Sequence, residues 1–127
     1  MSPLPKTAFV IAGGGSLGAV QVGMLKALHA RGVQADMVAG VSVGSINAYF
    51  YASNPTVAGI RHLENVWLGI RRRDVFPTPG LRELWRAVRG GDHLFDNAGL
   101  AGLLMRHLPG RDFESTRLPC FVEATDV

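Results

Sequence analysis

The stretch TAFVIAGGGSLGAVQVGMLKALHARGVQADMVAGVSVG, residues 7–44, decides the fold of this chain. Its first six residues are apolar without polar alternation, which predicts a strand buried on both faces of a parallel sheet. Apolar residues then recur at helical spacing up to a stop at Gly32, and this predicts a helix; they are Leu17, Val20, Met24, Leu25 and Leu28. A second short strand is predicted over residues 36–39, followed by a sharp turn at 40–44.

The flanking segments extend this alternation. Residues 45–52 predict a helix that ends at Asn54-Pro55, and Ile60, Leu63 and Trp67 share one face of a further helix that Asn54 or Thr56 could cap. Shorter helices are expected around residues 81–88 and 100–108, and a third strand over 119–125. The order of strands and helices predicts a three-layer α/β fold with a mostly parallel central sheet.

Three strands are few for such a sheet, which normally has about five or more. We therefore expect residues 7–127 to be part of a domain truncated at its C-terminal side, after a short leader at 1–6. Cys120 is the single cysteine, which excludes an internal disulfide. No signal peptide or membrane span is recognised, so we expect a cytoplasmic protein.

The pentapeptide GVSVG, Gly40-Val41-Ser42-Val43-Gly44, matches the G-x-S-x-G pattern of a nucleophile elbow. An apolar strand precedes it and a helix of small residues follows it. In that setting a serine is held on a strained turn with its hydroxyl exposed, so Ser42 is a candidate nucleophile. The alternative is a glycine-rich turn whose serine merely caps a helix.

The glycine loop GGGSLG lies between the first strand and the first helix. Its backbone N–H groups could bind the oxyanion that forms when a serine attacks an ester. It could also hold a dinucleotide pyrophosphate, but such a site would want an acidic residue at the end of the second strand. That strand ends in Ala39 and continues into the serine turn, so the oxyanion site is favoured and a dinucleotide-binding βαβ fragment remains an alternative.

The pairing of GGGSLG with GVSVG resembles the patatin-like phospholipases, with weaker similarity in residues 92–99 and 120–126. The resemblance implies hydrolysis of lipid acyl esters by a Ser–Asp dyad. No cofactor is expected, and no metal, because the carboxylates Asp92, Asp96, Asp112 and Glu114 lack metal-ligand spacing. It assigns Ser42 as nucleophile within the elbow, and the backbone of four glycines as the oxyanion hole: Gly13, Gly14, Gly15 and Gly18.

One part of the family pattern is absent. The dyad aspartate of the family lies in an Asp-Gly-Gly or Asp-Gly-Ala motif, and no such motif occurs in these 127 residues. Asp126 matches a strand-end aspartate of the family and not its base. We therefore expect weak or no catalysis by this chain alone, with a non-catalytic module that binds lipid or fatty acid as the alternative.

The expected partner is a lipid or acyl-ester substrate, not a nucleic acid. A basic region with two tryptophans, Trp67 and Trp85, could contact a membrane surface, or it could be a solvated helix face with core tryptophans; its arginines are Arg71, Arg72, Arg73, Arg82, Arg86 and Arg89. The net charge of +3 permits an anionic surface without requiring one. Open sheet edges would also favour self-association.

Overall fold

The computed structural model describes residues 6–14, 17–70, 106–110 and 112–123. The chain divides into two compact units, Met1–Leu68 with Pro109–Val127, and Gly69–Leu108. Nearly all described residues belong to the first unit, to which the following description applies. The arginine cluster, Trp85, and the helices predicted around 81–88 and over most of 100–108 lie outside the described residues.

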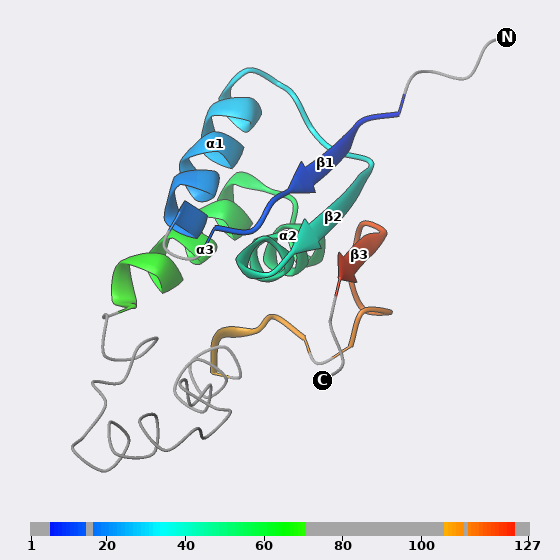
Figure 1. Cartoon of the computed structure of the whole chain (residues 1–127). Coiled ribbons are helices and arrows are strands. Elements are labelled where there is room, and N and C mark those ends of the chain that lie inside the picture. The colour runs from blue at the N-terminus through cyan, green and yellow to red at the C-terminus, as the bar shows by residue number, and fades with distance from the viewer. Residues whose placement is uncertain (1–5, 15–16, 71–105, 111, 124–127) are drawn as a thin grey trace, which may run out of the picture. The chain divides into compact units, whose positions relative to one another are not determined.

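Three parallel strands form an open sheet in the order β1-β2-β3 (Figure 1). They are β1 (Ala8–Ile11), β2 (Met37–Val41) and β3 (Cys120–Glu123). The predicted α/β class and the three predicted strands are confirmed, although β2 runs two residues further than expected, up to the serine turn. Ile11 pairs with Gly40, and Gly40 with Val122, so the carboxyl ends of the strands meet at one edge of the sheet.

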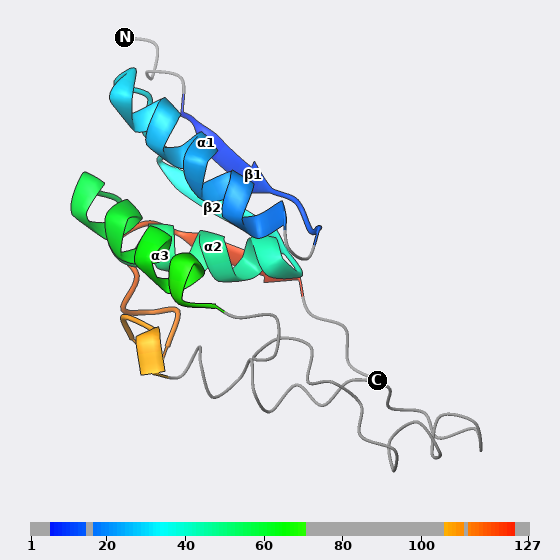
Figure 2. The same cartoon turned by 90° about the vertical axis from the view of Figure 1, so that its left-hand side faces the viewer.

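Three helices lie on the same side of this sheet, as Figure 2 shows. They are α1 (Gly18–Ala30), α2 (Val43–Ser53) and α3 (Val57–Gly69), each close to its predicted position. Of the two candidate caps for α3, Thr56 is the one used, because its Oγ1 accepts the Gly59 N–H at 3.1 Å. α2 begins at Val43, immediately after Ser42, and so lies two residues nearer the serine than predicted.

The core lies between the helices and the sheet. α2 runs through its centre and is buried around its circumference, including Ala48, Phe50 and Tyr51, as expected for a helix that is apolar on all sides. Val38 of β2 and Leu63 of α3 are almost fully buried against it. Burial of this apolar surface, at roughly 25 cal/mol per Å², is the main force that fixes α2 and the turn before it.

The opposite face of the sheet is open, and the prediction that residues 7–12 are buried on both faces is therefore wrong. β1 alternates between buried and exposed residues, and Val10 is 76% exposed. Val10, Ala39 and Phe121 lie in register across the three strands, and Phe121 is 58% exposed. Among the described elements, the helices all pack on the other face, so the apolar run of β1 has only one covered side.

α1 forms as predicted, but it buries a different face from the one its largest side chains suggest. Gly18, Val22 and Leu25 are buried, whereas Leu17, Val20 and Met24 are each about 60% exposed. The reason is the close contact of Gly18 with α2 and α3: a Cβ at Gly18 would lie 2.7 Å from Val43 Cγ2 and against the Trp67 ring. This contact fixes the rotation of α1 about its axis.

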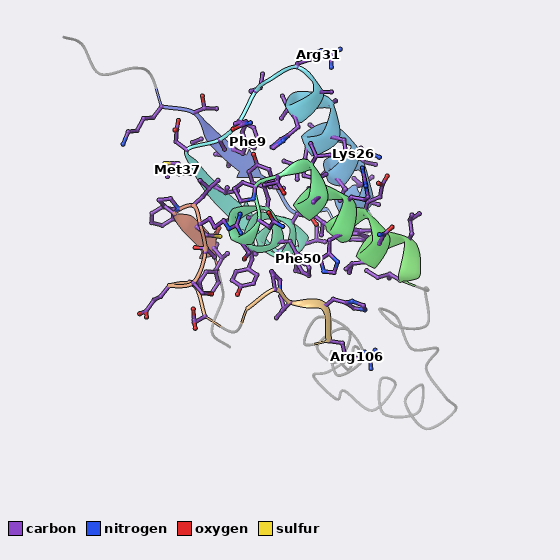
Figure 3. The ribbon with its side chains drawn as sticks, turned by 180° about the vertical axis from the view of Figure 1, so that it is seen from behind. Phe9, Lys26, Arg31, Met37, Phe50 and Arg106 are labelled. Carbon is purple, nitrogen blue, oxygen red and sulfur yellow. The ribbon has the colours of Figure 1, made fainter. Side chains whose placement is uncertain are left out.

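Polar contacts also join α1 to the other helices. Figure 3 shows Lys26 on the side of α1 that faces α3, where its Nζ lies 2.6 Å from Glu64 Oε1. Both side chains are partly exposed, so this ion pair contributes little stability. His29 Nε2 lies within hydrogen-bond distance of Tyr51 Oη, at 2.7 Å, and this contact joins α1 to α2.

Candidate active site

Ser42 occupies a backbone conformation that side-chain-bearing residues rarely adopt. Its φ is 54° and its ψ is −127°, and it is the single non-glycine residue with positive φ among those the structure describes. Such a conformation costs an L-amino acid on the order of 1–3 kcal/mol and persists only where the surrounding structure enforces it. The turn between β2 and α2 is therefore strained at the serine predicted from the G-x-S-x-G pattern.

The two glycines of the pentapeptide are required by close backbone packing. A Cβ at Gly40 would collide with the Gly44 carbonyl, and a Cβ at Gly44 would collide with the Ile11 and Ala12 carbonyls. The first turn of α2 thus lies directly against the end of β1. Neither position has room for alanine without movement of the backbone, and this close packing holds the turn in its strained form.

The side chain of Ser42 does not cap a helix, which was the alternative interpretation of the G-x-S-x-G pattern. Although Ser42 precedes α2, it makes no side-chain capping hydrogen bond to the helix. Ser45 ties the turn together instead: its N–H donates to the Ser42 carbonyl and its Oγ to the Gly40 carbonyl, each at 2.9 Å. Ser42 itself is solvent-exposed, so its hydroxyl is accessible at the N-terminal, electropositive end of α2.

The glycine loop lies beside this serine. A Cβ built on Gly13 would lie 3.3 Å from Ser42 Cβ and 3.9 Å from Ser42 Oγ. Gly14 has a φ of +149°, a conformation open to glycine, and its carbonyl accepts the Leu17 N–H at 3.1 Å. Gly15 lies outside the described residues, and Gly18 is buried at the start of α1. The structure therefore brings Gly13 next to Ser42 and gives Gly18 a place in helix packing.

A buried polar network connects the loop to α2, and sequence analysis missed it. Asn47 is fully buried, and its Nδ2 donates to the Gly18 carbonyl at 2.9 Å and to Gln21 Oε1 at 2.8 Å. Gln21 Nε2 donates in turn to the Ala12 carbonyl at 2.7 Å, and Trp67 Nε1 donates to Asn47 Oδ1 at 2.8 Å. The available signal was a lone asparagine within residues 45–52, which are mostly small or apolar.

The network also includes Trp67 of α3. Its indole N–H is bonded inside the fold and its ring packs over Gly18. Trp67 therefore packs within the fold, with its side chain half-buried. Trp85 and the arginine cluster lie beyond the part of the chain that the structure describes.

The described residues thus form a parallel α/β layer with an exposed serine on a strained strand-to-helix turn, next to a glycine loop. This local geometry is typical of α/β hydrolytic folds. The family model described as Patatin-like phospholipase matches residues 9–126, so the chain belongs to the patatin-like phospholipase family. This family of lipid-hydrolysing proteins is the one that the paired glycine motifs resemble.

Curated relatives match over part of the chain. A patatin-like phospholipase domain-containing protein of Caenorhabditis elegans is 34% identical over 79 residues, which cover 62% of this chain and 5% of that protein. Neuropathy target esterase sws of Drosophila sechellia and of Drosophila melanogaster are each 36% identical over 58 residues, covering 46% of this chain and 4% of theirs. The chain thus aligns with only a small fraction of these long proteins. No solved structure matches it.

In the described part of the chain, no helix is both long enough and apolar enough to cross a bilayer.

Proposed function

We propose that this chain carries the nucleophile of a serine acyl hydrolase, and that Ser42 attacks the carbonyl carbon of a lipid or other acyl ester. The observation that carries the proposal is the strained conformation of an exposed, uncapped Ser42 at the N-terminus of α2. A serine with a purely structural role would gain nothing from positive φ, which a glycine would adopt at lower cost. Membership of a lipid-hydrolase family supports the same assignment.

The chemistry follows from the groups around Ser42. Attack by Oγ places negative charge on the carbonyl oxygen of the ester, and that oxyanion needs hydrogen-bond donors already in place. The N–H groups of Gly13 and Gly14 lie on the loop beside Ser42, and the Val43 N–H begins α2. We assign these amides to the oxyanion hole. The alkoxide of the ester leaves with the proton that the Ser42 hydroxyl gave up to the general base. Water then hydrolyses the acyl-Ser42 ester, releasing the acid and free Ser42.

Activation of Ser42 requires a general base, which removes the hydroxyl proton during attack. The motif that carries this base in the family is not found in the 127 residues, and Asp126 lies outside the described ones. Without its base a serine nucleophile loses most of its activation, which lowers the rate by roughly 10⁴–10⁶-fold. The expected activity of this polypeptide is accordingly small but dependent on Ser42.

Hydrolysis of p-nitrophenyl butyrate tests the proposal. We expect slow turnover by the 127-residue chain, loss of that turnover in Ser42→Ala, and retention in Ser53→Ala. Ser53 is a matched control because it lies on the same helix and its Oγ donates to the Tyr49 carbonyl at 2.7 Å. Equal turnover in Ser42→Ala would assign the hydrolysis to another group and contradict the proposal.

Contact with a lipid surface is proposed for the outer face of α1. Its exposed apolar side chains, Leu17, Val20 and Met24, follow directly on the glycine loop, and α1 contains no acidic residue. We assign these three side chains to the contact because burial of exposed apolar area drives binding to a membrane interface. Cosedimentation with phosphatidylcholine–phosphatidylglycerol vesicles should fall at least about threefold in Met24→Asp, whereas Val57→Asp, at an exposed site on α3, should bind as wild type. Equal binding by both variants would contradict this assignment.

A further inference from the structure

Both ends of the glycine loop are held by one polar network centred on Asn47. At the N-terminal end the Ala12 carbonyl accepts from Gln21 Nε2, and at the C-terminal end the Gly18 carbonyl accepts from Asn47 Nδ2. Gln21 Oε1 accepts the second Nδ2 proton of Asn47, so both tethers depend on the same amide. No described backbone hydrogen bond joins the loop between these ends to β2 or α2.

The hydrogen bonds also fix the orientation of the Asn47 side chain. Its Oδ1 accepts from Trp67 Nε1, which can only donate, while both carbonyl-type partners of Nδ2 can only accept. A reversed amide would place oxygen against two acceptors and nitrogen against a donor. Asn47 is fully buried, so water cannot compensate for mismatched hydrogen-bonding partners. One rotamer and one amide orientation are therefore selected.

Asn47 lies on α2, the helix that starts directly after Ser42. We propose that Asn47 is a positioning residue, which holds the Ala12 and Gly18 carbonyls, and with them Gly13 and Gly14, at a fixed distance from Ser42. The catalytic meaning of this role rests on the proposed function, because the loop amides are its oxyanion donors. Misplacement of such donors by about 1 Å lowers a rate by roughly 100-fold.

The test uses the whole chain and the variant Asn47→Asp, which keeps the shape of the side chain and the acceptor for Trp67. It replaces the Nδ2 donor with a carboxylate oxygen that faces two acceptors. We expect the ¹⁵N order parameters of Gly13 and Gly14 to fall from about 0.85 to below about 0.6, with those of Val38 and Leu63 unchanged. Labelling of Ser42 by a fluorophosphonate should slow at least about 10-fold. Measurements are made at a concentration where the chain is monodisperse.

Two further variants separate positioning from general stability. Gln21→Met removes the Ala12 tether while Asn47 still holds Gly18, so it should loosen Gly13 in a chain that remains folded. Ser53→Ala should change neither readout. Lowering the pH should restore loop order in Asn47→Asp, because a protonated carboxyl regains one donor; it should not do so in Asn47→Leu.

Unchanged order parameters at Gly13 and Gly14 in both Asn47→Asp and Gln21→Met would overturn the proposal. So would a loss of order spread equally over Val38 and Leu63. If wild-type Ser42 is not labelled at all, the proposed hydrolase function fails, yet the order parameters still decide whether Asn47 holds the loop.

Discussion

Gly13 and Ser42 are 29 positions apart in the sequence and adjacent in space: a Cβ at Gly13 would lie 3.9 Å from Ser42 Oγ. The contact arises because β1 and β2 are parallel neighbours, so the loop after one strand and the turn after the other meet at the same edge of the sheet. The Ser42 hydroxyl and the backbone of Gly13 thereby lie together at this edge. Ligand sites in open α/β sheets form at the carboxyl ends of the strands for this reason.

Packing at the elbow predicts opposite effects for two glycine substitutions. Gly44→Ala should lower the free energy of unfolding by about 3 kcal/mol, because its Cβ would collide with the Ile11 carbonyl. Gly23→Ala, in α1 with nothing within 4 Å of the added Cβ, should raise it by about 0.5–1 kcal/mol. Urea titrations of the two variants measure both changes. A Gly44→Ala variant as stable as wild type would disprove the close packing described for the turn.

The buried Tyr51 predicts an alkaline limit to stability. Burial raises the pKa of Tyr51, an effect partly offset by a backbone hydrogen bond at Ala35. The folded pKa is therefore above the unfolded one, so the contribution of Tyr51 is present below the unfolded pKa, about 10, and is lost as pH rises through the folded pKa. Melting temperatures between pH 8 and 11 should fall less steeply in Tyr51→Phe than in Tyr49→Phe. Parallel falls in the two variants would contradict this account.

Tyr51→Phe should also be less stable than wild type at pH 8. It removes the contact with His29 Nε2, worth about 1 kcal/mol. Circular dichroism melts at that pH give the difference directly, and an unchanged melting temperature would show that the contact contributes nothing.

Cys120 of β3 should be a slow thiol. Burial raises its pKa, and the thiolate is the reactive form, so the folded chain contains less of it at neutral pH. Reaction with 5,5′-dithiobis(2-nitrobenzoate) at pH 7.5 should be roughly 10-fold slower in the folded chain than in the same chain in urea. Equal rates would place the sulfur in open solvent.

The open face of the sheet predicts self-association of the isolated chain. Val10 and Phe121 lie on this face and are mostly exposed, and an exposed apolar patch beside unpaired strand edges is a surface for contact between copies. Light scattering should show a mass that rises with concentration and is reduced in Phe121→Lys. Val57→Lys, at an exposed site on α3, should leave it unchanged. A monodisperse monomer at all concentrations would contradict this prediction.

Much of the fold was predictable because the local sequence patterns in the first half of the chain agree with the strands and helices that form there. Glycines separate apolar runs of clearly different period, so strands, helices and their parallel order follow from pattern alone. The serine turn was predictable because its pattern contains Gly40 and Gly44, each of which is needed for a close backbone contact. Pattern could not tell that β1 has one open face, since an apolar run looks the same whether one or two sides are covered.

The rotation of α1 and the Asn47 network were not predictable from pattern. Leu17, Val20 and Met24 satisfy helical spacing as well as Val22 and Leu25 do, and the choice between the two faces depends on how closely Gly18 approaches Trp67. Asn47 joins residues 20 and 26 positions away, and such long-range partners are fixed only once the helices have packed.

The central claim is that Ser42 is the reactive nucleophile, and labelling of the 127-residue chain with a fluorophosphonate tests it most directly. The account predicts covalent modification at Ser42, located by peptide mass spectrometry, that is abolished in Ser42→Ala and in urea and is retained in Ser53→Ala. Modification that is equal in Ser42→Ala, or a wild-type rate no faster in the folded chain than in urea, would contradict it.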